Sequence, residues 1–300
     1  MSALIEIVDL SKTYRDKRFR TVTALKAVNF SIYEGEAFGF IGPNGAGKST
    51  TIKILTGILA ATSGHAKVLG YPVEDPRSRQ KLGFVPENAC LYDYLTPLEI
   101  LMMGAKLHGV SKPDLRQHCL SWLERFDIAE VANRRIRSFS KGMVQRTALA
   151  HALVIEPRLL ILDEPLSGLD PVGRKEVVDV LLEYRQSGGT ILFSSHVLHD
   201  VERLADRFGL IHKGVLQTVQ RPDELVGGEA SFVVRSIGSQ SIPGMVRDTS
   251  ERWFVQTSAS NLWNVLERIR SGGHSIIEVK PSMSLEQAFL KFISNGTSSK

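Results

Sequence analysis

The chain has 300 residues, of which 43% are hydrophobic and 23% are charged, and this length is enough for one large domain and a second, small one. The charged fraction is ordinary for a globular protein. The formal net charge of +5 is compatible with phosphate ligands, nucleic acid or anionic lipid, but a slight excess of lysine and arginine also produces it without any such partner.

The chain contains two cysteines, Cys90 and Cys119, and neither belongs to a CxxC or metal-ligand spacing. This pattern argues against a disulfide framework and favours a reducing compartment. The first residues lack a positive charge followed by an apolar core, and no apolar run approaches the roughly 18 residues of a membrane span. We therefore expect neither a signal peptide nor a transmembrane segment, so that the chain cannot form a transport pathway alone.

The first part of the chain predicts strands that lead into a glycine-rich turn. Residues 36–41 are a short apolar run that ends at a glycine, which predicts a buried strand. Residues 48–59 then predict a helix with Ile52, Leu55 and Ile58 on one side. Strand, glycine turn and helix follow one another in the order that a phosphate-binding unit needs.

The middle and later parts predict a helical insert followed by alternating strands and helices. Residues 91–153 are rich in Leu, Met, Ala and Arg, and Thr96-Pro97-Leu98-Glu99 has the cap, proline and glutamate of a helix start. Residues 159–162 and 190–194 predict strands on either side of a helix at 173–186, which Gly188-Gly189 closes. Strands that alternate with helices predict a parallel sheet.

After about Arg221 the pattern changes to that of a small α+β module. Short strands are predicted at 231–235, 253–256 and 275–279, and helices at 262–270 and 285–292. The module carries no catalytic signature. Mediating dimerisation, regulating the first domain and bracing it are all compatible with its residues.

The strongest motif is a phosphate-binding loop. Residues 42–50 match the pattern G-x-x-x-x-G-K-[ST], in which glycines let successive backbone N–H groups face a phosphate and the following helix presents its positive end. Lys48 is predicted to reach the β- and γ-phosphates and Ser49 to ligate Mg²⁺. The predicted phosphate-binding residues are Gly42, Pro43, Asn44, Gly45, Ala46, Gly47, Lys48, Ser49 and Thr50.

Phosphate-binding loops occur in many enzymes, and a pair of adjacent carboxylates indicates that this one hydrolyses its nucleotide. The apolar run 159–162 is followed directly by Asp163 and Glu164. A buried strand thus delivers two carboxylates to its C-terminal end, where ligands bind in such sheets. We predict that Asp163 holds Mg²⁺ and that Glu164 accepts a proton from, or orients, the attacking water.

The order of these motifs resembles the nucleotide-binding domain of ABC transporters over residues 4–220. Ser140-Lys141-Gly142-Met143 occupies the place of the signature motif, and Ser167-Gly168-Leu169-Asp170 resembles the D-loop. His196 resembles the switch histidine, and Tyr14 lies where the family has an aromatic that stacks on adenine. The resemblance implies an α/β P-loop NTPase core of the ABC ATPase type at 1–220, with a helical subdomain at about 91–153, and an accessory α+β domain at 221–300.

The resemblance also implies a mechanism. Ser140 and Gly142 precede a helix that starts at about Met143, and they form a second anion site. Two subunits would sandwich two ATP molecules with Mg²⁺ in a homodimer, with Asp170 at the nucleotide and His196 on the γ-phosphate. Such an ATPase drives a separate membrane-spanning permease, so we expect a cytoplasmic protein, peripheral on the inner face of the membrane, that binds no nucleic acid.

Two departures from the common family pattern point to a subgroup. The signature has Ser-Lys-Gly-Met where Ser-Gly-Gly-Gln is frequent, and Glu87 stands where glutamine is typical. Glu87 can still accept hydrogen bonds and contact Mg²⁺, but it adds a negative charge. Both variants resemble the ATPases of ABC-2 type exporters, and the segment 284–290 resembles the tail helix of that subgroup.

Two alternatives remain for the function. A soluble ABC ATPase acting on DNA or ribosomes is disfavoured because only residues 51–139 separate the loop from the signature, too few for a long coiled coil, and only one cassette is present. A regulatory subunit that binds ATP without hydrolysis is disfavoured by the intact Glu164 and His196.

Overall fold

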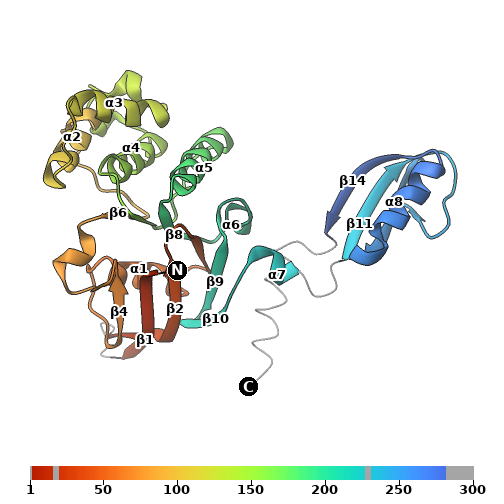
Figure 1. Cartoon of the computed structure of the whole chain (residues 1–300), viewed down its shortest axis with the longest axis horizontal. Helices are drawn as coiled ribbons and strands as arrows, with labels where there is room; N and C mark the ends of the chain where they lie inside the picture. Colours follow the sequence, from red (N-terminus) through yellow and green to blue (C-terminus); the bar gives the residue numbers. More distant parts are fainter. Residues whose placement is uncertain (1, 16–19, 227–230, 282–300) are drawn as a thin grey trace. The chain divides into compact units, whose positions relative to one another are not determined.

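The computed structural model describes residues 2–15, 20–226 and 231–281. The chain divides into two compact units, Met1–Gln220 and Arg221–Lys300 (Figure 1). The predicted helix at 285–292, which includes most of the segment 284–290, lies outside the described residues. No helix in the described part of the chain is long and apolar enough to cross a membrane.

The first unit is built on a six-stranded sheet of order β10-β9-β3-β8-β7-β6. Its pairs from β9 through β3, β8 and β7 to β6 are parallel, and only β10 runs antiparallel, in a hairpin with β9. Every residue of β3, β7 and β8 is buried, as expected for parallel strands covered on both faces. The predicted parallel sheet is confirmed. Its strands are β3 (Ala37–Ile41), β6 (Leu82–Val85), β7 (Leu159–Leu162), β8 (Thr190–Ser195), β9 (Arg207–His212) and β10 (Val215–Gln220).

A second sheet, of order β2-β1-β4-β5, is antiparallel throughout. The sequence predicted strands here but not this separate sheet. Its apolar face shares one core with the parallel sheet, in which the rings of Phe30 and Phe38 stack with centroids 5.1 Å apart. Its strands are β1 (Ala3–Arg15), β2 (Thr21–Tyr33), β4 (Ser63–Val68) and β5 (Tyr71–Pro72).

Helix α1 (Lys48–Leu55) follows the phosphate-binding loop but is shorter than predicted. It ends at Leu55 because Thr56 caps it and Gly57 adopts a left-handed φ of 71°, which terminates a helix. Ile52 and Leu55 are fully buried as predicted. The prediction that Ile58 lies on the same side is wrong, since Ile58 is beyond the helix and 62% exposed.

The helical insert contains α2 (Pro97–Leu107), α3 (Leu115–Arg125) and α4 (Lys141–Val154), which pack against one another (Figure 1). The predicted start of α2 is confirmed: Thr96 and Glu99 form a reciprocal capping box. The prediction that α4 starts at about Met143 is corrected, because Ser140 is its N-cap and Gly142 lies inside its first turn. Short 3₁₀ turns occupy Pro76–Arg79, Ala129–Val131 and Ile136–Ser138.

Two helices connect strands of the parallel sheet at the site. Helix α5 (Pro171–Gln186) lies between β7 and β8, and Asp170 caps it by accepting from the N–H of Gly173. The chain leaves α5 through Gly188, whose φ is 94°, as the sequence predicted. Helix α6 (Leu198–Leu204) follows β8 directly.

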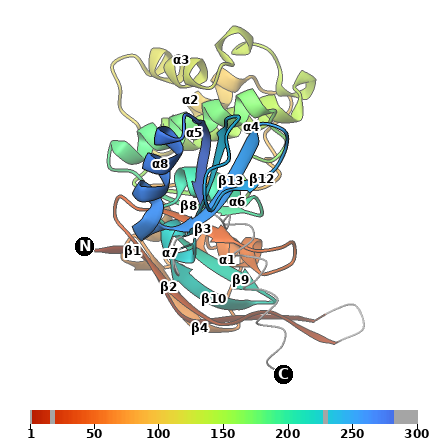
Figure 2. The same ribbon diagram turned by 90° about the vertical axis from the view of Figure 1, so that its right-hand side faces the viewer.

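The second unit is a four-stranded antiparallel sheet of order β12-β13-β11-β14 with one long helix (Figure 2). Helix α8 buries Val265 and Ile269 against Val234 and Ile242. The predicted strands and the helix at 262–270 are confirmed, each with slightly longer bounds. The elements are α7 (Pro222–Val226), β11 (Ser231–Ile237), β12 (Val246–Arg247), β13 (Arg252–Ser258), a 3₁₀ turn (Ala259–Asn261), α8 (Leu262–Ser271) and β14 (Ser275–Pro281).

Candidate nucleotide-binding site

The phosphate-binding loop lies between β3 and α1, and its conformation depends on glycine at three positions. Gly45 and Gly47 have left-handed φ values of 77° and 118°, which L-residues with a Cβ rarely adopt. At Gly42 an added Cβ would lie 2.3 Å from the carbonyl oxygen of Ile211. No side chain caps α1, so its first-turn N–H groups are directed at the space above the loop.

A cavity of about 290 Å³ opens at this loop. Glu87, which follows β6, Glu164, which follows β7, and His196, which follows β8, all contribute to its wall. Adjacent parallel strands place their C-terminal ends at one edge of the sheet, so residues remote in sequence meet here. The lining residues are Ala24, Pro43, Asn44, Gly45, Ala46, Gly47, Lys48, Ser49, Thr50, Glu87, Glu164, Ser167 and His196.

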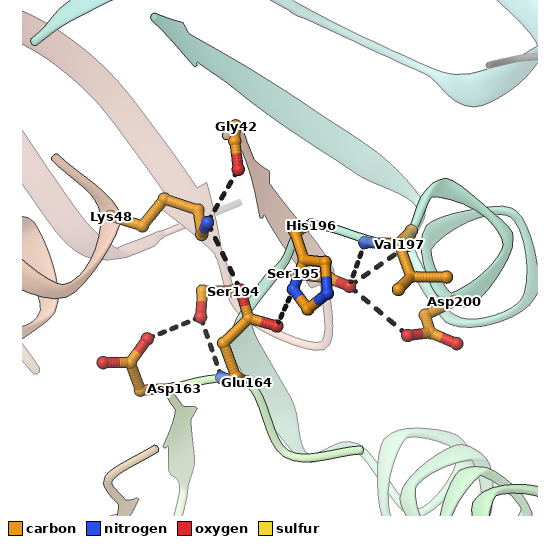
Figure 3. A network of polar contacts seen from close by, with 9 residues as sticks. All are labelled: Gly42, Lys48, Asp163, Glu164, Ser194, Ser195, His196, Val197 and Asp200. Atoms are coloured by element: carbon orange, nitrogen blue, oxygen red, sulfur yellow. Dashed lines mark hydrogen bonds and ion pairs between the residues drawn. The ribbon is translucent and has the colours of Figure 1, made fainter. Parts of the chain in front are cut away.

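Lys48 is a buried cation at the base of this cavity, with 6% of its side chain exposed. Its ammonium donates to the carbonyl oxygen of Gly42 at 2.7 Å and lies 3.2 Å from Oε1 of Glu164 (Figure 3). A buried charge is tolerated only when it is paired and hydrogen-bonded. Glu164 is therefore both the predicted catalytic acid–base residue and the counter-ion of Lys48.

Glu164 joins the lysine to the predicted switch histidine. Its Oε2 lies 2.8 Å from Nδ1 of His196, so one carboxylate contacts both groups (Figure 3). The backbone of Glu164 has a φ of 52°, in the left-handed region that is uncommon for a residue other than glycine. Local strain of this kind persists only when the surrounding contacts fix it, and it is frequent at functional sites.

Ser194 supplies one of the contacts that fix Glu164. Its hydroxyl accepts from the backbone N–H of Glu164 at 2.8 Å and donates to Oδ1 of Asp163 at 2.6 Å (Figure 3). The sequence analysis assigned no role to Ser194. Its position at the end of a predicted strand, beside the predicted histidine, was the signal that could have identified it.

The predicted Mg²⁺ ligands lie in two places. Ser49 and Glu87 line the cavity, whereas Asp163 is 4% exposed and its carboxylate faces Ser194. Within the described ranges no three His, Cys, Asp or Glu residues form a metal cluster. Hydroxyl and carboxylate oxygens suit Mg²⁺, which binds through one or two carboxylates together with substrate phosphates rather than in a complete protein cage. The donor set therefore fits Mg²⁺ bound together with a nucleotide.

Tyr14 lies beside the loop and not in the cavity wall. It is 39% exposed near the end of β1, and its hydroxyl is 3.5 Å from the hydroxyl oxygen of Thr50. The ammonium of Lys12 lies 5.4 Å from the centre of its ring. The ring lies at the edge of the phosphate loop, and its stacking on adenine, which the family resemblance implies, stays a prediction.

Ser140, Gly142 and Asp170 line a different cavity, of about 530 Å³, which shares no residue with the first. Ser140 and Asp170 use their side chains to cap α4 and α5, accepting from Met143 and Gly173. The structure therefore brings the phosphate-binding loop with Lys48, Glu164 and His196 together at one cavity. Ser140, Gly142 and Asp170 lie at the other.

The sequence also gave no role to Gln145 in α4. Its side chain is 3% exposed and donates to the carbonyl oxygen of Pro165 at 3.0 Å. Pro165 directly follows Glu164, so this bond ties the helical insert to the segment that carries the carboxylate pair. Its position two residues after the signature segment, which ends at Met143, was the available signal.

A family model described as ABC transporter matches residues 25–167. An uncharacterized ABC transporter ATP-binding protein of Nostoc sp. is 35% identical over 296 residues, which cover 95% of this chain and 88% of the relative. The chain belongs to the family of ABC transporter ATP-binding proteins. It is accordingly an ATPase and the ATP-binding subunit of an ABC transporter.

Two relatives of this ABC ATPase carry functional names. The linearmycin resistance ATP-binding protein LnrL of Bacillus subtilis is 35% identical over 75% of this chain and 73% of its own length. The lantibiotic transport ATP-binding protein SrtF of Streptococcus pyogenes is 37% identical over 70% of this chain and 88% of its own length. The ABC ATPase thus has exporter-type relatives.

Solved structures agree with this family. An ATP-binding subunit of an ABC transporter superposes with a TM-score of 0.68 and 33% identity over 74% of this chain and 91% of the other. A dimeric ATP-binding cassette bound to ADP and Pi superposes with a TM-score of 0.67 and 25% identity, over 72% and 98%. The predicted fold, a P-loop ABC ATPase core, is confirmed.

Proposed function

We propose that this ABC ATPase powers an ABC-2 type exporter whose permease is a separate membrane protein. The exporter-type relatives support the subgroup, as do Glu87 and the Ser-Lys-Gly-Met signature. The observation that carries the mechanism is the carboxylate of Glu164, which contacts Lys48 and His196 at the phosphate-loop cavity.

The ion pair of Lys48 with Glu164 suggests how nucleotide activates the site. The β- and γ-phosphates of ATP carry more negative charge than one carboxylate, so they compete for the ammonium of Lys48. Glu164 is then free to accept a hydrogen bond from the attacking water and orient it. His196 lies beside Glu164 at the cavity wall and is placed to hydrogen-bond the γ-phosphate.

Ser49 and Glu87 in the cavity wall, together with the buried Asp163, are the residues that would hold Mg²⁺. The ion would neutralise phosphate charge as the bond to the γ-phosphate breaks. Ser194 holds Asp163 through a 2.6 Å hydrogen bond and so orients one member of this set. Tyr14, beside Thr50, would stack on the adenine.

The separate cavity of Ser140, Gly142 and Asp170 supports a dimer. These residues do not reach the phosphate loop of their own chain, whereas a two-fold arrangement would let each subunit complete the site of its partner. Two ATP molecules would then lie between the subunits, and hydrolysis would reopen them. This arrangement makes the homodimer the active form.

The loop between β6 and α2 is a candidate surface for the permease. Glu87 lines the nucleotide cavity, and Tyr92 and Tyr94 on the same loop are 55% and 61% exposed with ring centroids 5.7 Å apart. Exposed aromatic side chains are favoured at protein interfaces. A permease held at this loop would place the ATPase on the cytoplasmic face of the membrane.

A pull-down from solubilised native membranes tests the proposal, with Glu164→Gln as bait in ATP and Mg²⁺. Hydrolysis should be slowed by about 10²- to 10³-fold while binding persists, which would hold the dimer closed. We expect one multi-spanning membrane protein with this bait and little with Lys48→Ala. Recovery of only ribosomes, nucleic acid or soluble proteins would contradict the exporter proposal. Glu124→Gln, an exposed glutamate of α3, is the matched control for turnover.

A further inference from the structure

The turn that carries His196 is held by a single hydroxyl group. Ser195, the last residue of β8, is 3% exposed, and its Oγ accepts from the backbone N–H of Val197 at 2.9 Å. The same hydroxyl lies within donor distance of two acceptors, the carbonyl oxygen of Val197 at 3.1 Å and Oδ2 of Asp200 at 3.3 Å (Figure 3). The backbone on both sides of His196 is thus fixed through Ser195.

Asp200, in the first turn of α6, is a buried carboxylate to which the mechanism above gives no role. It is 7% exposed, and burial raises its pKa, while the charge of Arg174 and the hydrogen bond from Ser195 oppose that rise. Burying an ionisable group costs stability, and such groups are frequent at functional sites. Its hydrogen bond to Ser195 directs it toward the turn of His196.

A cavity of about 100 Å³ is lined by Glu164 and His196 together with Arg174, Ser195 and Asp200. The imidazole of His196 is 52% exposed, and in the described part of the chain its one hydrogen bond runs to Glu164. Few contacts therefore hold this ring in place. Its position depends on the hydrogen bond to Glu164 and on the backbone that carries His196.

We propose that Asp200 is a positioning residue for His196. Its carboxylate holds the hydroxyl of Ser195, the hydroxyl holds the turn, and the turn directs the imidazole at Glu164 and the phosphate cavity. This inference rests on the role in hydrolysis proposed above for His196. It predicts that Asp200 acts on turnover more than on the affinity for ATP, because Ser195 and Asp200 do not line the cavity that the phosphate-binding loop forms.

The test measures kcat and KM for ATP in the full chain. Asp200→Ala should lower kcat about tenfold and leave KM for ATP within about twofold, and Ser195→Ala should do the same, because misplacing a reacting group by a fraction of an ångström is costly. Asp200→Asn keeps an oxygen that accepts from Ser195 and should restore kcat to within about threefold. Glu202→Ala, an exposed position on α6, is the matched control.

A cycle with His196→Ala separates positioning from general destabilisation. In that background Asp200→Ala should change kcat less than twofold, because the residue it positions is gone. NMR of ¹⁵N-labelled histidine provides a second readout, in which Asp200→Ala should shift the Nδ1 signal of His196. An unchanged kcat in Asp200→Ala, an equal loss in the His196→Ala background, or an unmoved signal would overturn the inference. Wild-type kcat in His196→Ala itself would instead overturn the proposed role of His196.

Discussion

The two units of the chain differ most in the polar groups that they bury. The first unit buries Lys48, Asp163, Glu164 and Asp200 around the ends of β7 and β8. In the described part of the second unit no Asp, Glu, Lys or Arg is buried, and the buried polar residues are Ser236, Thr257 and His274. Burying a charge is expensive, so the cluster of buried charges in the first unit marks a candidate site of chemistry.

The largest expected effect comes from removing Lys48, the buried lysine at the phosphate-loop cavity. Lys48→Ala should lower ATP turnover by about 10²- to 10³-fold, because the phosphates lose their charged partner and Glu164 loses its counter-ion. Phosphate release measures it. Lys53→Ala, an exposed lysine on the same helix, is the control and should keep wild-type turnover. Undiminished turnover in Lys48→Ala would remove the basis for the site.

A smaller effect is expected when the hydroxyl of Ser194, which contacts both Asp163 and Glu164, is removed. Ser194→Ala leaves the buried N–H of Glu164 without its acceptor, so the free energy of unfolding of the first unit should fall by about 1–3 kcal/mol. Turnover should fall as well, because Asp163 loses the donor that orients it. Urea unfolding and ATPase rates measure the two effects. Ser187→Ala, an exposed serine at the end of α5, is the comparison, and equal losses in both variants would contradict the role of Ser194.

In the second unit we expect a substitution that lowers stability without lowering ATP turnover. His274 is 7% exposed; its Nε2 lies 2.7 Å from the carbonyl oxygen of Gln240, and its Nδ1 lies 3.1 Å from the hydroxyl oxygen of Ser236. Since a carbonyl only accepts, Nε2 carries the proton and Nδ1 accepts from Ser236. His274→Ala should lower the stability of the second unit by about 1–3 kcal/mol while ATP turnover stays within twofold. A loss of turnover as large as that of Ser194→Ala would show that the two units are not functionally separate.

The smallest expected effect is a pH dependence of the protein's stability that arises from Asp200. Burial raises its pKa in the folded protein above the ordinary value of 3.8, so its contribution to stability is fully present below that value and is lost as the pH rises through the folded-state pKa. The variant Asp200→Asn lacks this loss. Its melting temperature relative to the wild type should therefore increase by about 1–3 °C between pH 4 and pH 7. A difference that is constant with pH would contradict the burial of an ionised Asp200.

Local sequence predicted the parts of the fold that depend on neighbouring residues. The start of α2 follows from Thr96 and Glu99, three positions apart, and the burial of β7 and β8 follows from uninterrupted apolar runs. The end of α1 was predicted too late, because the apolar spacing continued to Ile58 while Gly57 broke the helix. The glycine was in the sequence, but its left-handed conformation depends on the chain turning back to the sheet.

The sequence by itself determined the phosphate-binding loop and the carboxylate pair at a strand end, because each consists of residues close together in the chain, and the order of such motifs indicated the family. Only the tertiary structure decided that Glu164 bridges Lys48 and His196, and that Ser194 and Ser195 hold the segments that carry them. The physical reason is that a parallel sheet brings the ends of strands distant in sequence to one edge. Which side chains meet there, and which charges become buried, depends on strand order and packing, which no local pattern encodes.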